Sequence, residues 1–571
     1  MEIDFIPLDY DYFDFNGRNY VRIIGRNSSG KRVCIIDTCD IYFWAILKEK
    51  VNSKKIDGLI EKIKKIKLDI KGRQTCVENV ELHDKNFMGK KVKALKIFAT
   101  NYKDLHDIAD KLGFPEIECR RGYDLGFITH YIIERKINPL CWYEISGEFA
   151  HGKFPGIENI EVDLCIELKF VKKIEDKTFS PKVLAYDIET NDLKIGGGEI
   201  LMISLVSENF KKVITWKKSK HTPNFVEYVK DEAELIEKFV EYTKKISPDF
   251  LVGYFSDGFD LPYLKARANE LKIPLNLGLD DSSPRFFRKS FGKDFSTAKI
   301  FGLIHIDILK FIQTAYSQYM QSETLSLNEV AKEFLGDGKK NFDFNSFDDL
   351  NSQNWENYFE YCLHDSVLTF GLFEKFWPDM LEFSKIIKEP IFDISRNGLS
   401  KQVEGYILHN LERFNEIPEK RPTYDEIGKR RHRKKVEGAF VLEPTPGLYE
   451  NLALFDFTSM HTSIIITMNI SKSTLLEKKE KDAHESPEIE FEGKKTKFYF
   501  SKNPGFIPVL MEEILEKRKK YKEEYKKNSN EITFARSNAF KLLSASVHGY
   551  IGFFGARYYS LESSASVLAF V

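Results

Sequence analysis

Four acidic residues and one tyrosine have the types and spacing that metal-dependent chemistry requires. Asp187 and Glu189 stand two residues apart in LAYDIET, a predicted strand, so both carboxylates leave the same face. Asp260 opens a predicted helix in VGYFSDGFDLPYL. Tyr361 and Asp365 are four residues apart in YFEYCLHDSVLT, which places a phenol and a carboxylate on one helical face.

Phosphodiester hydrolysis requires this set of side chains. Divalent cations such as Mg²⁺ or Mn²⁺ prefer oxygen ligands, and a pair of them can activate a water and neutralise charge on the leaving oxygen. A phenol can orient the attacking water. Each pair of residues is a weak signal alone, because such spacings are common on ordinary protein surfaces. The order of the segments and their flanking residues make the prediction specific.

Together these segments resemble the three exonuclease motifs of family B DNA polymerases, which read DIET, FDxPYL and YxxxD in this order. The segments HIDILKF at 305–311 and LSLNEVAKEFLG at 325–336 resemble further parts of the same domain. The resemblance implies an RNase H-like 3′→5′ proofreading exonuclease in which the four acids hold the metal ions and Tyr361 positions the water. Phe255 stands where the family usually has Asn, so we expect an altered contact to the single-stranded 3′ end.

Three later segments resemble the polymerase motifs of the same family. LFDFTSMHTSII resembles motif A, whose aspartate, here Asp456, binds both catalytic metal ions. FIPVLMEEILEKRKKYKEE carries Arg518 and Lys522 four residues apart at triphosphate-binding positions, and Lys541 opens KLLSASVHGY, which resembles motif B. Three cations on a helical hairpin would neutralise the triphosphate of an incoming dNTP and stabilise the departing pyrophosphate.

Several positions around the expected nucleotide pocket depart from the family pattern. His461 stands at the tyrosine that blocks a ribose 2′-hydroxyl, and Thr462 replaces the usual proline. Ala545 and His548 replace the Asn and Tyr of motif B, and Val436 replaces the tyrosine of an upstream element that contacts template. The resemblance therefore implies that His461 and Ala545 line a changed nucleotide pocket.

Motif C, the DTDS-type hairpin that supplies the second palm aspartate, does not occur in the 571 residues. Nucleotidyl transfer by two metal ions needs at least two carboxylates, so Asp456 alone is an incomplete site. We therefore expect a DNA polymerase large subunit that acts on primer-template DNA with a small second polypeptide carrying motif C and the thumb, as in split archaeal enzymes. A sliding clamp is a further expected partner. A truncated chain, a stand-alone exonuclease and a non-catalytic DNA-binding subunit are the alternatives.

Composition sets wider limits on the protein. The 571 residues, with 42% hydrophobic and 30% charged residues, predict several folded domains. The 86 Lys and Arg nearly balance the 87 Asp and Glu, but KRRHRKK and KRKKYKEEYKK could line a phosphate backbone. The N-terminus is acidic, no apolar run reaches about 18 residues, and the seven cysteines form no CxxC pair. We expect no membrane span and a cytoplasmic protein.

The predicted elements that position these residues form a mixed α/β and α+β chain. Short apolar runs and one amphipathic helix begin the chain, strands around a helix follow, and a strand pair, GAFVLEP with LALFDFT, precedes two long helical patterns. The resemblance implies an N-terminal domain at 1–176, to which residues 377–420 return, and an exonuclease domain at 177–376. The first part of a palm follows at 421–505 and a fingers hairpin at 506–554. Residues 555–571 would be the incomplete start of a second palm part.

Overall fold

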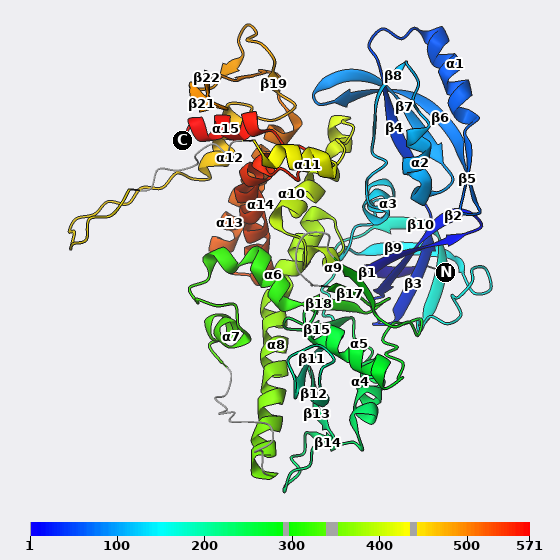
Figure 1. The fold of residues 1–571 in the computed structure, drawn as a ribbon, viewed down its shortest axis with the longest axis vertical. Helices are drawn as coiled ribbons and strands as arrows, with labels where there is room; N and C mark the ends of the chain where they lie inside the picture. The colour runs from blue at the N-terminus through cyan, green and yellow to red at the C-terminus, as the bar shows by residue number, and fades with distance from the viewer. Residues whose placement is uncertain (1, 289–295, 339–351, 434–441) are drawn as a thin grey trace.

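The computed structural model describes residues 2–288, 296–338, 352–433 and 442–571. Two sheets form the N-terminal third, a larger sheet occupies the middle of the chain, and helices dominate the C-terminal part (Figure 1). The mixed α/β architecture predicted from the sequence is confirmed. Val436 lies outside the described residues, as does part of GAFVLEP.

The N-terminal part contains a closed barrel and a second, five-stranded sheet in the order β5-β6-β7-β4-β8. The barrel strands are β1 (Glu2–Phe15), β2 (Arg18–Arg26), β3 (Arg32–Asp37), β9 (Tyr143–Phe149) and β10 (Leu164–Lys173). The sheet strands are β4 (Tyr42–Leu47), β5 (Lys67–Ile70), β6 (Arg73–Phe87), β7 (Lys90–Ala99) and β8 (Ile117–Arg121). Helices α1 (Ser53–Lys64), α2 (Leu105–Asp110) and α3 (Phe127–Arg135) accompany them.

Helix α1 forms in the amphipathic stretch where the sequence predicts a helix. Asn52 caps it by accepting a hydrogen bond from the backbone N–H of Lys55. Ile56, Leu59 and Ile63 recur at helical spacing and are buried against the strands.

The middle of the chain forms a six-stranded sheet in the order β14-β13-β12-β11-β15-β18. Helices α4 and α5 pack on one face, and α8 packs on the other against β12 and β13. The strands are β11 (Val183–Thr190), β12 (Ile200–Ser207), β13 (Phe210–Thr215), β14 (Val226–Tyr228), β15 (Phe250–Gly253) and β18 (Ile304–Asp307). The helices are α4 (Glu232–Ile246), α5 (Asp260–Glu270), α6 (Ile308–Ala315) and α7 (Leu327–Leu335), and β16 (Arg285–Arg288) pairs with β17 (Ser296–Lys299).

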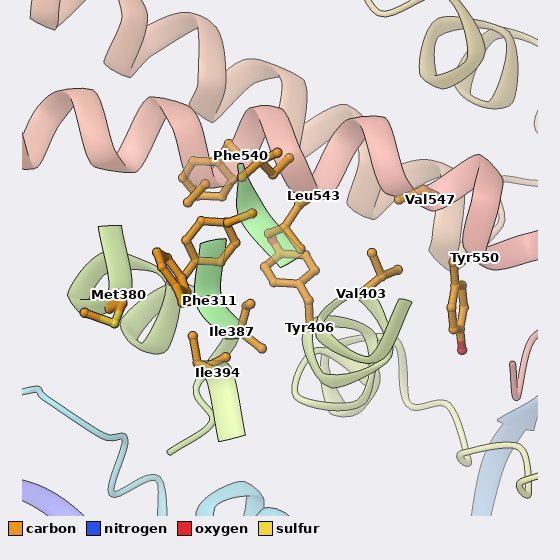
Figure 2. Packing of buried hydrophobic residues seen from close by; sticks show 14 of the residues in the cluster. Phe311, Met380, Ile387, Ile394, Val403, Tyr406, Phe540, Leu543, Val547 and Tyr550 are labelled. Atoms are coloured by element: carbon orange, nitrogen blue, oxygen red, sulfur yellow. The ribbon is translucent and has the colours of Figure 1, made fainter. Parts of the chain in front are cut away.

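Helix α8 (Ser352–Ile387) is a single helix that runs from the sheet toward the C-terminal helices (Figure 1). It crosses residue 376, where the sequence suggests the end of the exonuclease domain. Near its C-terminal end, Met380 and Ile387 pack in a large apolar cluster with Phe311 of α6 and Phe540 of the fingers hairpin (Figure 2). The same helix therefore contacts both halves of the molecule.

The C-terminal part is built on an antiparallel helical hairpin, as the sequence predicts. Tyr521 of α13 (Phe506–Lys527) stacks on Phe540 of α14 (Glu531–Gly552) with ring centroids 5.9 Å apart. Around the hairpin lie α9 (Ile391–Ile394), α10 (Leu399–Leu408), α11 (Tyr424–Arg431), α12 (Met460–Thr467) and α15 (Leu561–Ala569). Two small sheets contain β19 (Leu475–Leu476), β20 (His484–Glu485), β21 (Ile489–Phe491), β22 (Lys494–Thr496) and β23 (Tyr499–Phe500).

The strand predicted at LALFDFT does not form, and the prediction was wrong. Residues 452–457 have no regular structure, and Leu454 and Phe455 are 97% and 90% exposed. The described part of GAFVLEP, 442–444, is not a strand either. An apolar β-type segment becomes a strand only when another strand takes its backbone hydrogen bonds, and within the described ranges no strand pairs with this one.

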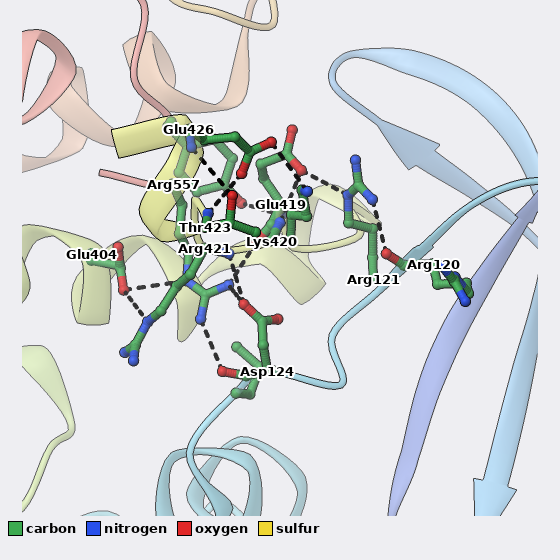
Figure 3. A network of polar contacts seen from close by, with 12 residues as sticks. Arg120, Arg121, Asp124, Glu404, Glu419, Lys420, Arg421, Thr423, Glu426 and Arg557 are labelled. Carbon is green, nitrogen blue, oxygen red and sulfur yellow. Dashed lines mark hydrogen bonds and ion pairs between the residues drawn. The ribbon is translucent and has the colours of Figure 1, made fainter. Parts of the chain in front are cut away.

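A buried arginine joins three distant parts of the chain (Figure 3). The Arg557 guanidinium donates from Nη1 to Asp124 Oδ2 and to the Glu419 carbonyl oxygen, both at 2.7 Å, and from Nε to Glu404 Oε1 at 3.2 Å. Burial opposes its charge, but the carboxylates of Asp124 and Glu404 raise its pKa above the usual value. The N-terminal part, α10 and the C-terminal part therefore meet around one charge.

Among the described residues, none of the helices combines the length and the apolar character needed to cross a bilayer. All seven cysteines carry free thiols.

Candidate functional site

The two carboxylates of LAYDIET lie on the face of the sheet that α8 covers. Asp187 is opposite Ser204 of β12 and Glu189 is opposite Met202. The Ser204 hydroxyl donates to the carbonyl oxygen of Cys362 in α8 at 2.8 Å, which joins this strand to the helix. Carboxylate oxygens of Asp187 and Glu189 and the Cys362 sulfur all lie within 4.8 Å of one another. Strand alternation and helix packing thus bring three metal-ligating groups together.

Asp260 approaches the same strand from the start of α5. Its buried carboxyl accepts a hydrogen bond from the backbone N–H of Ile188, the residue between the two strand acids. Its pKa is raised to about 8. Burial is the largest cause, and the negative charges of Asp307 and Glu189 add to it. Several carboxyl groups are therefore crowded into one poorly solvated site.

Helix α8 presents Tyr361 and Asp365 as the sequence predicts, one turn apart on the same helical face. Asp365 is buried, and its charge is one of those that raise the pKa of Cys362, after burial, Glu189 and Asp187. Tyr361 is half-buried, and its ring stacks on Tyr358 with centroids 6.0 Å apart. These two side chains thus lie beside the strand acids.

Sequence reasoning missed two residues of this site, Tyr358 and Cys362. The Tyr358 hydroxyl donates to Glu189 Oε2 at 2.6 Å, and burial followed by the Glu189 charge raises its pKa above the usual range. Its position three residues before Tyr361 is a signal that could have identified it, because both then share a helical face. Cys362 had no such signal, since its role as a neighbour of the acids depends on how α8 packs.

Residues of α12 and α14 that the sequence predicts for the nucleotide pocket lie in contact. The rings of His461 and His548 stack with centroids 4.5 Å apart and an interplanar angle of 21°. Burial lowers the pKa of both imidazoles, which favours their neutral forms. The Thr462 hydroxyl donates to the Ser544 carbonyl oxygen at 2.8 Å, and Ala545 next to it is exposed. Contacts between α12 and α14 therefore involve His461, Thr462 and His548.

The three predicted triphosphate cations have different surroundings. Arg518 donates to the hydroxyl of Ser459 at 2.7 Å, which is three residues after Asp456. Lys522 is exposed, one turn further along α13. The Lys541 ammonium lies 4.4 Å from the ring centroid of Tyr319. Asp456 itself is exposed in the irregular segment described above.

Comparison with known proteins identifies the family. Residues 119–330 match the family model "DNA polymerase family B, exonuclease domain", and residues 391–570 match "DNA polymerase family B". The chain is 30% identical over 573 residues to "DNA polymerase 1" of Pyrococcus abyssi, across 98% of this chain and 67% of that protein. The chain belongs to DNA polymerase family B.

Two further relatives of this family B chain agree. It is 30% identical to a "DNA polymerase" of Pyrococcus glycovorans, across 98% of this chain and 66% of the relative. The structure of the family B DNA polymerase from the hyperthermophilic archaeon Pyrobaculum calidifontis matches with a TM-score of 0.79 and 25% identity, over 100% of this chain and 71% of that one. The chain spans about two thirds of the length of the curated relatives it matches.

The acidic site of this family B chain fits divalent cations. Carboxylate oxygens are the ligands that Mg²⁺ and Mn²⁺ prefer, and those of Asp187 and Glu189 lie close enough to share an ion. Burial, and after it the charges of Asp307 and Glu189, raise the pKa of Asp260, and a bound cation would favour its ionised form. Burial and the charges of Glu189 and Asp187 raise the pKa of the neighbouring Cys362 thiol, which disfavours the thiolate that a metal would need.

Proposed function

We propose that this chain is a 3′→5′ exonuclease that shortens the primer strand of DNA. The observation that carries the proposal is the convergence of Asp187 and Glu189 of β11 with Asp260 of α5 beneath α8. With Asp365, these acids would hold Mg²⁺ or Mn²⁺. Bound there, the ions supply charge neutralisation for the scissile phosphate and a more acidic water.

The protein side chains would position the reactants. Tyr361 would orient the attacking water, and Tyr358 would hold Glu189 in place through its hydrogen bond. The proposed reaction adds water to the last phosphodiester, breaks the bond between phosphorus and the 3′ oxygen of the penultimate nucleotide, and releases a nucleoside 5′-monophosphate. The shortened strand keeps a 3′-hydroxyl.

A primer-degradation assay tests this proposal. The purified chain with magnesium should degrade the labelled 3′ end of a primer, and Asp187→Ala should abolish the degradation. The matched control is Glu208→Ala, which removes an exposed acid from the turn after β12. Full activity of the Asp187→Ala variant would refute the site assignment.

We also propose that the C-terminal part contributes half of a DNA-directed DNA polymerase site for primer-template DNA and dNTPs. Arg518, Lys522 and Lys541 would bind the triphosphate, and Asp456 would bind metal. The exposed apolar segment around Asp456, which pairs with no strand of the described residues, supports a place for a further strand. A small subunit with motif C and the thumb would supply that strand and a second carboxylate, and a sliding clamp would retain the complex on DNA.

Primer extension distinguishes this proposal from that of a stand-alone exonuclease. Adding a polypeptide with a DTDS-type hairpin and thumb should produce extension, and Asp456→Ala should remove it while exonuclease activity persists. Extension that survives Asp456→Ala, or no extension with any such polypeptide, would favour an enzyme that only degrades DNA.

His461 and Ala545 are proposed to line the sugar pocket. His461 stacks on His548, so its ring is held in place as a steric element rather than as an acid or base. His461→Tyr should lower ribonucleotide incorporation by the assembled enzyme, measured as alkali-sensitive product. Unchanged incorporation would refute the steric role.

The domain boundaries given from the sequence remain our proposed division of the chain. We also propose a cytoplasmic location, which the seven free thiols support.

A further inference from the structure

A cavity of about 380 Å³ lies where the fingers hairpin meets three other elements. Its walls come from the end of β10, the C-terminal end of α8, α10, and helices α13 and α14. Arg518, Lys522 and Lys541, the residues proposed to bind the incoming nucleotide, do not line it. The cavity is therefore separate from both sites described above.

Cations outnumber acids around this cavity. Two of its five basic residues have carboxylate partners, since Lys385 pairs with Asp176 at 3.0 Å and Arg536 pairs with Glu382 at 2.7 Å. The remaining three are Lys173, Lys388 and Lys517. In the described ranges of the chain, none of these three ammonium groups has a carboxylate at ion-pair distance.

Lys388 lies at the centre of this excess charge. It follows α8 directly with a positive φ of 65°, and it is half-buried. Burial lowers its pKa, and the positive charges of Lys136, Lys173, Arg413 and Lys517 lower it further. Lys173 and Lys517 are exposed where they line the cavity, and their charges together with that of the half-buried Lys388 favour an anion there.

We propose that this cavity binds a small polyphosphate, with Lys173, Lys388 and Lys517 contacting its anionic oxygens. A polyphosphate carries several negative charges along a short chain, which matches three unpaired ammonium groups on three different elements. The stacked rings of Tyr521 and Phe540 form an apolar wall beside them. The source is either an inorganic polyphosphate or the triphosphate of a nucleotide.

Occupancy of this cavity would affect the fingers hairpin. Lys517 belongs to α13, whereas Lys173 ends β10 and Lys388 follows α8. An anion that contacts all three replaces repulsion with attraction, and it therefore holds the hairpin against the rest of the molecule. The site would couple polyphosphate concentration to the position of the fingers.

Calorimetric titration of the intact chain with inorganic triphosphate, at low salt and without divalent cations, tests the proposal. Lys388→Met and Lys517→Met should each weaken binding about tenfold, the loss expected for one charge-assisted contact. Lys172→Met and Lys519→Met are matched controls, because these lysines are exposed like Lys173 and Lys517 but do not line the cavity. Unchanged affinity in the Lys388→Met, Lys517→Met double variant would overturn the proposal.

A second set of titrations separates this cavity from the nucleotide face. Binding of triphosphate should persist when Arg518 and Lys522 are both replaced by Ala, and its loss there would overturn the assignment. Comparable affinity for triphosphate and dATP indicates an inorganic ligand, and tighter binding of dATP indicates a nucleotide. Equal binding of sulfate would refute polyphosphate recognition.

Thermal unfolding without ligand tests the repulsion among the lysines. The Lys388→Met variant should melt at the same or a higher temperature than wild type, because repulsion is removed. A lower melting temperature would contradict the argument.

Discussion

At the scale of single residues, the exonuclease site depends on contacts that hold charged groups in place. The Glu189 side chain is flexible, and the Tyr358 hydroxyl restrains it by donating a hydrogen bond to Oε2. A charged acceptor makes this bond stronger than a neutral one. Tyr358 therefore acts on the proposed metal site through Glu189, as a positioning residue.

Tyr358→Phe should weaken metal binding at this site. Losing a hydrogen bond to a charged group costs about 1.5–3 kcal/mol, so the Mn²⁺ concentration for half-maximal exonuclease activity should rise about tenfold or more. Tyr242→Phe is the matched control, since Tyr242 donates to Glu227 in the same domain away from the site. Equal Mn²⁺ dependence in both variants would show that the Tyr358 hydroxyl has no positioning role.

At the scale of elements, the segment at 452–457 is unusual because it is both apolar and exposed. Leu452 and Phe457 are 82% and 78% exposed, in addition to the two residues between them described above. Exposed apolar residues in a row indicate an interaction surface. Its backbone is also open to proteases, which bind their substrates in an extended form.

Limited digestion with chymotrypsin should cut first at Leu454, Phe455 or Phe457. Phe500 of β23 and Tyr558 of the turn before α15 serve as internal controls, because both are buried and should resist cleavage. Mass spectrometry of the first fragments identifies the site. Addition of the partner proposed above should slow this cut, and early cleavage elsewhere would contradict the exposed placement of the segment.

Another element-scale feature is the contact between the β6–β7 turn and the segment after α10. Asn86 and Glu416 form a parallel β-bridge, and the Glu416 carboxyl accepts hydrogen bonds from the backbone of Met88 and Gly89. Burial raises the pKa of this carboxyl to about 7. The folded chain therefore keeps a proton on Glu416 between about pH 4.5 and 7, where the unfolded chain has lost it.

Glu416→Gln should consequently change how stability depends on pH. The proton on Glu416 stabilises the folded chain, and this stabilisation is lost as the pH rises from about 4.5 through 7. At pH 8 the wild type should therefore be less stable than the variant by up to about 3 kcal/mol. The difference should vanish near pH 4.5. Urea unfolding at several pH values measures it, and a constant difference across this range would contradict the raised pKa.

At the scale of the whole molecule, a few buried polar contacts hold the N-terminal and C-terminal parts together. Arg557 connects them through Asp124, Glu404 and the carbonyl of Glu419 (Figure 3). Removing one partner of a buried ion pair leaves the others buried and uncompensated. The junction should therefore respond strongly to loss of the guanidinium.

Arg557→Met should lower the free energy of unfolding by about 3–5 kcal/mol. The control is Arg413→Met, which breaks a more exposed pair with Glu513 and should cost no more than about 1 kcal/mol. Calorimetric unfolding measures both. Equal effects of the two variants would show that the buried junction does not hold the parts together.

The amino-acid sequence predicted the local structure wherever periodicity and capping agree. The α1 helix, the strands at LAYDIET and ILMISLVS, and the helical hairpin all form as predicted, because each buries its apolar face against a neighbour in the chain. The LALFDFT segment has no such neighbour among the described residues, and it does not form the predicted strand. Its pattern is that of a strand, but a strand needs a partner that local sequence does not specify.

Sequence alone also predicted which residues carry the chemistry of the candidate site and, through motif resemblance, indicated the family. Only the tertiary structure decided what surrounds them, including the hydrogen bond from Tyr358 to Glu189, the His461–His548 stack and the unpaired lysines behind the fingers hairpin. The physical reason is distance along the chain. Side-chain spacing is set by local geometry, whereas the contacts of residues tens to hundreds of positions apart depend on how whole elements pack.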